Sequence, residues 1–218
     1  MKELQKFKEI FQGLDCAYGT YKIERTNDNN KRVGKAFTIA KPPLDELWRK
    51  HLEGVEPSLG IIPIRADNSC TWGAIDIDQY PLDLNVIIAK VKSFNLPLVT
   101  LRSKSGGAHV YAFVKNPVPA ADMQKYLNAC ASLLGQAGRE KQSQILVERG
   151  DTGNFLNLPY FNCDSTLRYA IKPDGSAATL EEFFEIYEAN VQDGLKTPAP
   201  PQKKDQPAPN GPPCLQAL

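Results

Sequence analysis

The sequence has few of the residues that disulfide frameworks, thiolate metal sites and membrane spans require. Its five cysteines are scattered and odd in number, and no C-x-x-C pair occurs, so unpaired thiols in a reducing compartment are expected. No apolar run approaches the roughly 20 residues of a transmembrane helix. The charged N-terminal stretch also lacks the apolar centre of a signal peptide. We therefore expect a cytoplasmic protein with no membrane partner.

A strong net charge is missing as well. Lysine and arginine total 26, aspartate and glutamate total 25, and the formal net charge is +1. Proteins that coat duplex DNA without sequence preference are usually far more basic. Any contact with nucleic acid must therefore be local, or organised around a bound metal ion that adds positive charge.

The chain of 218 residues is long enough for one sizeable core or for one domain built from two lobes. Residues 196–213 are rich in proline and have no apolar periodicity, which predicts a linker. Residues 214–218 are apolar again, and we interpret them as the start of a truncated C-terminal region. The folded domain is accordingly predicted over residues 1–195.

Helical and strand patterns alternate along this domain. The spacing predicts helices over residues 2–11, 43–52, 84–94, 120–134 and 180–190. Asp83 is expected to cap the third of these helices, and Thr179 with Glu182 forms a capping box for the last. Strands are predicted over residues 17–23, 35–40, 97–102, 108–114, 144–148, 154–160 and 167–171.

Residues 60–64 and 71–78 are expected to form a hairpin around a turn at residues 66–69. From residue 60 onward the order of elements is close to β-β-α-β-β-α-β. This order predicts an α+β fold, with an antiparallel-rich sheet and helices on one side of it.

Two aspartates lie one residue apart in an otherwise apolar run, AIDIDQY, at residues 74–80. Strand side chains alternate between faces, so Asp76 and Asp78 are expected to point the same way. Neighbouring carboxylates on a largely buried strand repel each other and are costly to desolvate, which favours a cation between them. Oxygen ligands on a rigid strand suit Mg²⁺ or Mn²⁺ completed by substrate phosphates. The alternative, a solvated pair at a sheet edge, is disfavoured by the apolar neighbours.

A second candidate element is the stretch LRSKSGGAHVYAF at residues 101–113. Ser103, Lys104 and Ser105 supply hydroxyl and ammonium donors. Gly106 and Gly107 allow the backbone to approach an anion closely, as phosphate-binding turns do.

The chain contains only two histidines. His109 directly follows this loop and begins a strand, which favours a functional role near the loop. His51 lies in a predicted amphipathic helix, and a structural role is favoured for it.

A third acidic residue is expected to complete a metal site with the two aspartates. Glu148 ends a predicted strand and is slightly favoured, because Glu140 lies in a stretch that is not strand-like. Asn157 follows the next turn, where it is expected to satisfy turn backbone.

Taken together, AIDID, RSKSGGAHV and an acid before GNFLNLPYF resemble the three motifs of the archaeo-eukaryotic primase superfamily. The similarity is to the primase-polymerase branch of phages, plasmids, CRISPR-associated operons and related conflict systems, and it spans roughly residues 6–188. It implies a catalytic domain with an N-terminal α/β lobe of about residues 1–58 and an RRM-like palm of about residues 59–195. The end of the chain resembles the opening of an accessory region, so a further C-terminal domain is expected in the full-length protein.

The resemblance also implies roles for individual residues. Asp76 and Asp78 correspond to the metal-binding pair, and His109 to the histidine that contacts the incoming triphosphate. The third acid is Glu148, or Glu140 if three residues are absent relative to family members with an E-I-F-P-K-Q element. The nucleotide-binding residues implied in this way are Arg102, Ser103, Lys104, Ser105, Gly106, Gly107, His109 and Asn157.

The activity implied by the resemblance is that of a DNA primase-polymerase. A primer hydroxyl would attack an NTP or dNTP on single-stranded DNA, with two Mg²⁺ or Mn²⁺ ions. Basic and aromatic residues such as Lys115, Tyr111 or Tyr160 are candidates for gripping the template. Two alternatives stay open: a metal-dependent phosphodiesterase or nuclease, which the scarcity of histidine disfavours, and a catalytically silent single-strand-binding module.

Overall fold

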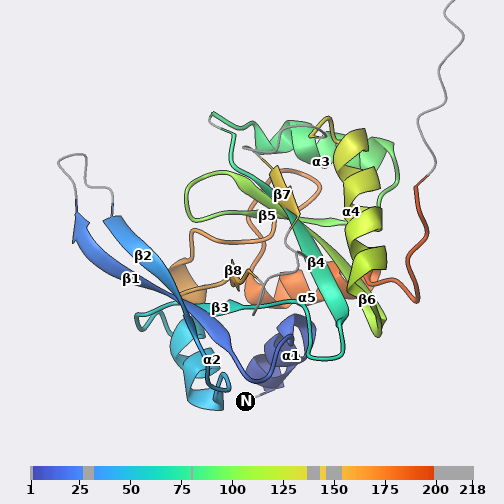
Figure 1. Cartoon of the computed structure of the whole chain (residues 1–218). Coiled ribbons are helices and arrows are strands. Elements are labelled where there is room, and N and C mark those ends of the chain that lie inside the picture. Colours follow the sequence, from blue (N-terminus) through green and yellow to red (C-terminus); the bar gives the residue numbers. More distant parts are fainter. Residues whose placement is uncertain (1, 27–31, 80, 137–142, 146–153, 199–218) are drawn as a thin grey trace, which may run out of the picture.

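The computed structural model describes residues 2–26, 32–79, 81–136, 143–145 and 154–198 (Figure 1). It contains the helices α1 (Lys2–Phe11), α2 (Asp45–Leu52), α3 (Leu84–Ser93), α4 (Ala120–Leu133) and α5 (Leu180–Asn190), and a 3₁₀ turn at Cys163–Ser165. None of the helices in these ranges is long and apolar enough to cross a membrane.

Two four-stranded antiparallel sheets form the framework of the molecule. The first has the order β2-β1-β3-β8, from Arg32–Ile39, Tyr18–Thr26, Leu59–Ile61 and Leu156–Asn157. The second has the order β5-β6-β4-β7, from Val99–Arg102, Ala108–Pro119, Ser69–Ile77 and Ser143–Ile145. The predicted α+β class with antiparallel-rich sheets is confirmed.

The predicted hairpin of residues 60–64 and 71–78 is wrong. β3 pairs with β1 and β8 in the first sheet, whereas β4 pairs with β6 and β7 in the second. Pro63 lies two residues after the end of β3 and has no N–H group with which to continue a ladder. The chain therefore leaves the first sheet at this point and enters the second one.

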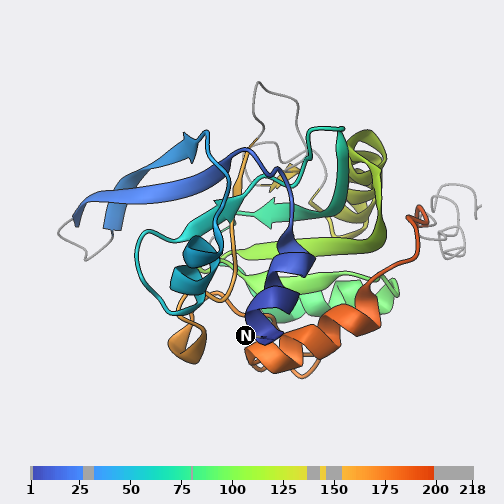
Figure 2. The same ribbon diagram turned by 90° about the horizontal axis from the view of Figure 1, so that it is seen from below.

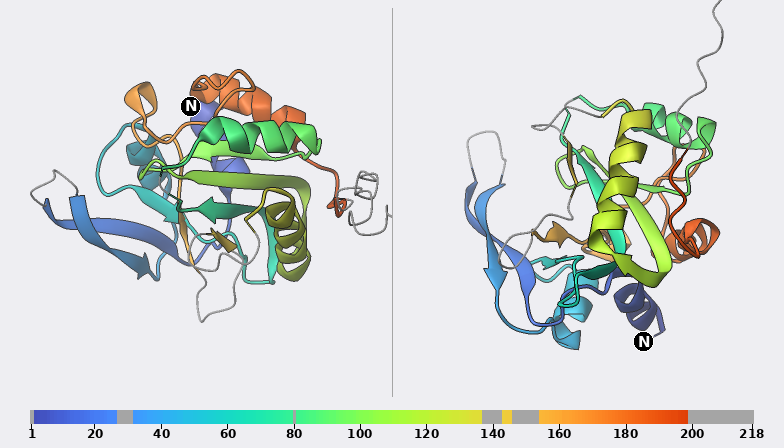
Figure 3. Two further views of the ribbon diagram at one scale, coloured as in Figure 1. Left: turned by 90° about the horizontal axis from the view of Figure 1, so that it is seen from above. Right: turned by 45° about the vertical axis from the view of Figure 1, so that its right-hand side comes forward.

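Helices cover both faces of the second sheet, so the expectation of helices on one side is also wrong. α3 and α4 pack on the face that carries Ile75 and Val110, and α4 lies across β4 and β6 in Figure 3. α1 and α5 lie side by side in Figure 2 and pack with the opposite face, which carries Trp72 and Tyr111. Because both faces of these strands are apolar, helices must pack on both of them to bury the apolar side chains.

The core between the two sheets is built from aromatic rings. Phe11 of α1 stacks on Phe183 of α5 at 5.8 Å and meets Trp72, Tyr111 and Phe113 edge-on at 5.7 to 5.8 Å. Leu59, Ile61, Leu156 and Leu158 of the first sheet belong to the same cluster. This shared core packs the first sheet against the face of the second sheet that carries Trp72 and Tyr111.

The predicted helix starts are confirmed where a side-chain cap was expected. The Asp83 carboxylate accepts a hydrogen bond from the Asn85 N–H, and Thr179 and Glu182 form the full capping box. α2 begins at Asp45, two residues later than predicted.

Several predicted strands are shorter in the structure. Of residues 154–160 only β8 is a strand, because Tyr160 has a φ of 60° and ends the extended run. Residues 167–171 contribute only isolated bridges, Leu101 with Ala170 and Ile171 with Ala177.

The first sheet contains strands from both sides of residue 58. Gly19 of β1 lies opposite Gly60 of β3, and Gly60 lies opposite Asn157 of β8. The division into a lobe of residues 1–58 and a palm of residues 59–195 stays a prediction, as do the linker and the C-terminal region beyond it.

Candidate active site

The acidic pair lies at the end of β4. Asp76 is the second-last residue of the strand, and its side chain is 21% exposed, while Asp78 directly follows the strand and is exposed. The residues between and before them, Ile75 and Ile77, are fully buried in the core beneath α3 and α4. The alternation expected from the sequence therefore places Asp76 on the face opposite Ile75 and Ile77, the face that also carries Trp72 and Ala74.

His109 lies directly opposite Asp76 in the neighbouring strand β6. Its Nε2 atom is 3.3 Å from the Asp76 Oδ1 atom, and the two side chains are 15% and 21% exposed. This contact does not form a hydrogen bond, so Asp76 Oδ1 is a buried acceptor without a hydrogen-bond partner among the described residues. Asp76 and His109 were selected from separate stretches of the sequence, and in the structure their side chains lie next to each other.

The glycine-rich loop between β5 and β6 closes against the end of β4. The Ser103 N–H donates to the Gly107 carbonyl at 2.9 Å, and the Gly106 N–H donates to the Ser103 carbonyl at 3.1 Å. Gly106 has a φ of +91°, which favours glycine, and a Cβ on Gly107 would lie 2.3 Å from the Ile77 carbonyl oxygen. Only glycine allows the loop to lie this close to the strand that carries the aspartates.

The polar side chains of this loop differ in their surroundings. Ser103 is 5% exposed, and its hydroxyl has no hydrogen-bond partner among the described residues, while Lys104 and Ser105 are exposed. The Lys104 ammonium lies 4.5 Å from the centre of the Tyr21 ring in β1. The Arg102 guanidinium donates from Nη1 to the Leu167 carbonyl at 2.9 Å.

Among the described residues, Asn157 makes no hydrogen bond or ion pair with this group. Asn157 lies in β8 of the first sheet, where its Oδ1 atom is buried without a hydrogen-bond partner in the described part of the chain. Glu148 and Glu140, the two candidates for the third acid, lie outside the described residues. Within the described ranges, no three His, Cys, Asp or Glu side chains are grouped closely enough to hold a metal ion.

His51 has the structural role that the sequence favoured. It is fully buried, its Nε2 lies 2.8 Å from the Pro159 carbonyl, and its Nδ1 accepts from the Leu59 N–H at 3.0 Å. Burial lowers the pKa of His51 to about 4, against the opposing effect of the Pro159 carbonyl. The imidazole is therefore neutral and ties α2 to β3 and to the segment after β8.

Two of the three template-gripping candidates are wrong. Tyr111 and Tyr160 are both fully buried, so neither ring can stack on a base of single-stranded DNA. Lys115 is exposed, and its ammonium pairs with Asp193 at 2.8 Å. The sequence did not reveal this burial, because in a strand that is apolar on both faces the pattern of residues does not distinguish buried aromatic rings from exposed ones.

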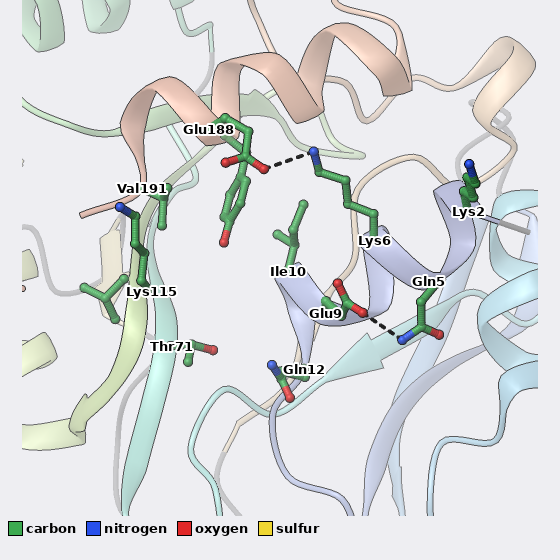
Figure 4. Close-up of a pocket in the computed structure, with 12 residues that line it drawn as sticks. Lys2, Gln5, Lys6, Glu9, Ile10, Gln12, Thr71, Lys115, Glu188 and Val191 are labelled. Atoms are coloured by element: carbon green, nitrogen blue, oxygen red, sulfur yellow. Dashed lines mark hydrogen bonds and ion pairs between the residues drawn. The ribbon is translucent and has the colours of Figure 1, made fainter. Parts of the chain in front are cut away.

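One surface cavity of the described residues lies away from the acidic pair. A cavity of about 730 Å³ lies between α1, α5 and the opposite end of β4, where Thr71, Lys115 and Tyr187 line it (Figure 4). An ion pair at 3.0 Å joins Lys6 of α1 to Glu188 of α5 at this cavity, and a hydrogen bond joins Gln5 to Glu9 along α1. Thr71 is five residues from Asp76 along the strand, a separation of roughly 17 Å.

A comparison with protein families agrees with the site described above, in which two acids and a histidine lie beside a glycine-rich loop. The family model for the archaeo-eukaryotic primase domain of the TOTE conflict system matches residues 21–182, which is more than half of the 218 residues. The chain belongs to this primase family. The matched range of the primase domain contains Asp76, Asp78 and His109 together with the loop, and the predicted membership of the superfamily is confirmed.

One solved structure similar to this primase domain is the archaeo-eukaryotic primase domain of the primase-polymerase of cyanophage S-2L. The two are 14% identical, with a TM-score of 0.45, over 84% of this chain and 95% of the phage chain. A comparison with curated proteins finds no match. Family membership supports a primase-like nucleotidyltransferase function for the domain.

Proposed function

We propose that this primase domain is a DNA primase-polymerase that transfers nucleotides from NTPs or dNTPs to a growing strand on a single-stranded DNA template. The observation that carries the proposal is the pairing of Asp76 with His109 beside the loop of residues 103–107, within the range that matches the family. The reaction joins a 3′-hydroxyl to the α-phosphate and releases pyrophosphate.

The residues present fit a divalent cation. Asp76 Oδ1 is a buried, charged acceptor without a hydrogen bond in the described part of the chain, which a ligated metal ion would satisfy. Mg²⁺ and Mn²⁺ prefer oxygen ligands, and Asp76, Asp78 and a third acid, Glu148 or Glu140, would hold them. When bound, two such ions activate the attacking hydroxyl and stabilise the leaving oxygen.

The other residues of the site bind the triphosphate in this proposal. The Gly106 N–H is already bonded to the Ser103 carbonyl. The Ser103 hydroxyl and the Gly107 amide lie where the loop meets β4, and Lys104 with Ser105 adds exposed donors. These groups neutralise β- and γ-phosphate charge, and His109 donates a hydrogen bond to the triphosphate without acting as a general base. Arg102 and Asn157 stay candidates for nucleotide contacts.

The described register does not choose between the two candidates for the third acid. Gln144 of β7 lies opposite Asp76, and both Glu140 and Glu148 are four positions from Gln144 in the sequence. Glu140→Gln and Glu148→Gln should therefore be compared in one assay. The variant that loses metal-dependent incorporation identifies the ligand.

The proposal is tested by incorporation of labelled NTPs and dNTPs on primed and unprimed single-stranded DNA with Mg²⁺ or Mn²⁺. Asp76→Asn should abolish both extension and priming, while Asp122→Asn, which removes an exposed carboxylate of α4 on the other side of the sheet, should not. Wild-type activity in the Asp76 variant would refute the role proposed for this carboxylate.

Two other outcomes would assign a different function. Metal-dependent cleavage of the oligonucleotide in the absence of nucleotides would indicate a phosphodiesterase or nuclease. Template binding that needs no metal, without any incorporation, would indicate a silent single-strand-binding module.

A further inference from the structure

The hydroxyl group of Tyr111 is not explained by packing. Tyr111 is fully buried in β6, and its hydroxyl has no hydrogen-bond partner among the described residues. Its ring stacks on Phe113 at 5.6 Å and meets Phe11 edge-on at 5.7 Å. A phenylalanine would keep these ring contacts and avoid the cost of burying an unpaired hydroxyl. The hydroxyl oxygen of Tyr111 therefore needs an explanation other than packing.

The strand register brings this hydroxyl group toward the acidic pair. Tyr111 lies opposite Ala74, and the next pair on the same face is His109 opposite Asp76. Diagonal neighbours on one face of an antiparallel pair are about 7 to 8 Å apart at the backbone, within reach of an aromatic side chain. The Tyr111 and His109 rings are 6.2 Å apart.

The two unpaired atoms are complementary. Burial is the main cause that raises the pKa of Tyr111, and the negative charge of Asp76 raises it further, while Arg168 opposes them. The phenol is therefore protonated and able to donate. Asp76 Oδ1 is an acceptor that lacks a hydrogen-bond partner in the same described part of the chain.

We propose that Tyr111 is a positioning residue for Asp76: its hydroxyl donates, directly or through one buried water, to the carboxylate and holds it in the orientation that binds metal. The inference rests on the metal role of Asp76 in the proposed function. Groups behind metal ligands orient them in this way, and their loss typically weakens metal binding about 10- to 100-fold.

The test compares Tyr111→Phe with Tyr126→Phe, which removes a hydroxyl group from a buried tyrosine of α4 in the other core cluster. Mn²⁺ binding is titrated by electron paramagnetic resonance, and thermal unfolding is followed without metal. Tyr111→Phe should bind Mn²⁺ about tenfold more weakly than the wild type, while it still unfolds in one cooperative transition above the temperature of the titration. Tyr126→Phe should bind Mn²⁺ as the wild type does.

Asp76→Asn serves as the reference in the same titration. If it weakens Mn²⁺ binding and Tyr111→Phe does not, the inference on Tyr111 is wrong while the proposed function stands. If Asp76→Asn binds as the wild type does, the metal role fails and the inference fails with it.

Discussion

A buried, neutral histidine makes the stability of this fold depend on pH. The pKa of His51 is lowered from 6.5 to about 4 by burial, so between these values the unfolded chain binds a proton that the folded one does not. The stabilising contribution is present above pH 6.5 and is lost as the pH falls toward 4. The shift corresponds to about 3 kcal/mol.

We therefore expect the free energy of unfolding, measured by urea denaturation, to fall as the pH is lowered from about 6.5 to about 4. His51→Gln should remove most of this slope because glutamine does not titrate. His109→Gln, which replaces the partly exposed histidine, should keep it. Equal slopes in the wild type and the His51 variant would mean that other groups cause the pH dependence.

The charge of Asp76 is predicted to serve the reaction and not the fold. Its Oδ1 atom makes no hydrogen bond with the described residues, and Asp78 lies two positions away, so removing one charge relieves repulsion. Asp76→Asn should leave the free energy of unfolding equal or slightly higher while incorporation is lost. Chemical denaturation measures the first quantity and a primer-extension assay the second. A large loss of stability would show that the carboxylate holds the strand together.

At the scale of elements, two glycines form the surface on which Phe155 rests. A Cβ on Gly19 would lie 1.9 Å from the Phe155 ring, and one on Gly60 would lie 2.3 Å from it. These glycines face each other across β1 and β3, and Phe155 directly precedes β8. The close approach of this ring requires the absence of both side chains.

Gly19→Ala is expected to destabilise the protein by about 1 to 3 kcal/mol through this clash. Gly194→Ala is the control, because a Cβ there meets nothing within 4 Å. Combining Gly19→Ala with Phe155→Ala should cost less than the sum of the single changes, which urea denaturation of the four proteins can measure. Additive costs would show that the ring does not cause the loss.

The contact between Lys104 and Tyr21 joins the loop of residues 103–107 to the other sheet. The ammonium lies 4.5 Å from the ring centre, and such contacts contribute about 0.5 to 1 kcal/mol at exposed sites. By restricting the lysine, the ring should favour the orientation that meets the triphosphate. Under the proposed function, Tyr21→Leu should raise the apparent nucleotide KM about two- to fivefold.

Tyr21→Phe retains the aromatic face and should keep the wild-type KM. In a Lys104→Ala background, Tyr21→Leu should have no further effect. Steady-state kinetics of nucleotide incorporation measure the wild type and these four variants. A lower KM in Tyr21→Leu would mean that the ring competes with the triphosphate for the lysine.

The sequence correctly predicts elements that are defined by neighbouring residues, such as capped helices. It fails to predict which strands pair when the partners are far apart in the chain. α3 and α5 start where Asp83 and Thr179 predict, because a cap is formed by residues within one turn. The hairpin of residues 60–64 and 71–78 is wrong because adjacency in the chain does not determine which sheet a strand joins. β3 finds its partners in β1 and β8, and β8 is far away in the sequence.

The same distinction applies to the site. Asp76 and His109 could be selected from their motifs, and the register of β4 and β6 places them opposite each other. Neither the position of Tyr21 under Lys104 nor the unpaired hydroxyl of Tyr111 has a signal in the sequence. Both depend on how strands that are far apart in the chain are placed against one another.

At the scale of the whole molecule, one aromatic core connects the two sheets. Trp48 of α2 and Trp72 of β4 belong to the same buried cluster, although they lie on either side of the predicted boundary at residue 58. The Trp72 indole also donates a hydrogen bond to the Gln12 carbonyl at 2.9 Å, which ties the N-terminal segment to the second sheet. A core shared in this way favours unfolding as a single cooperative unit.

We therefore expect the two tryptophans, the only ones in the chain, to report the same unfolding transition. Trp48→Phe leaves Trp72 as the reporter, and Trp72→Phe leaves Trp48. Within each variant, the urea midpoint from tryptophan fluorescence should equal the midpoint from far-UV circular dichroism, because loss of the common core removes the support of both sheets at once. If residues 1–58 and 59–195 unfold independently, the fluorescence and dichroism midpoints will separate, and in opposite directions in the two variants.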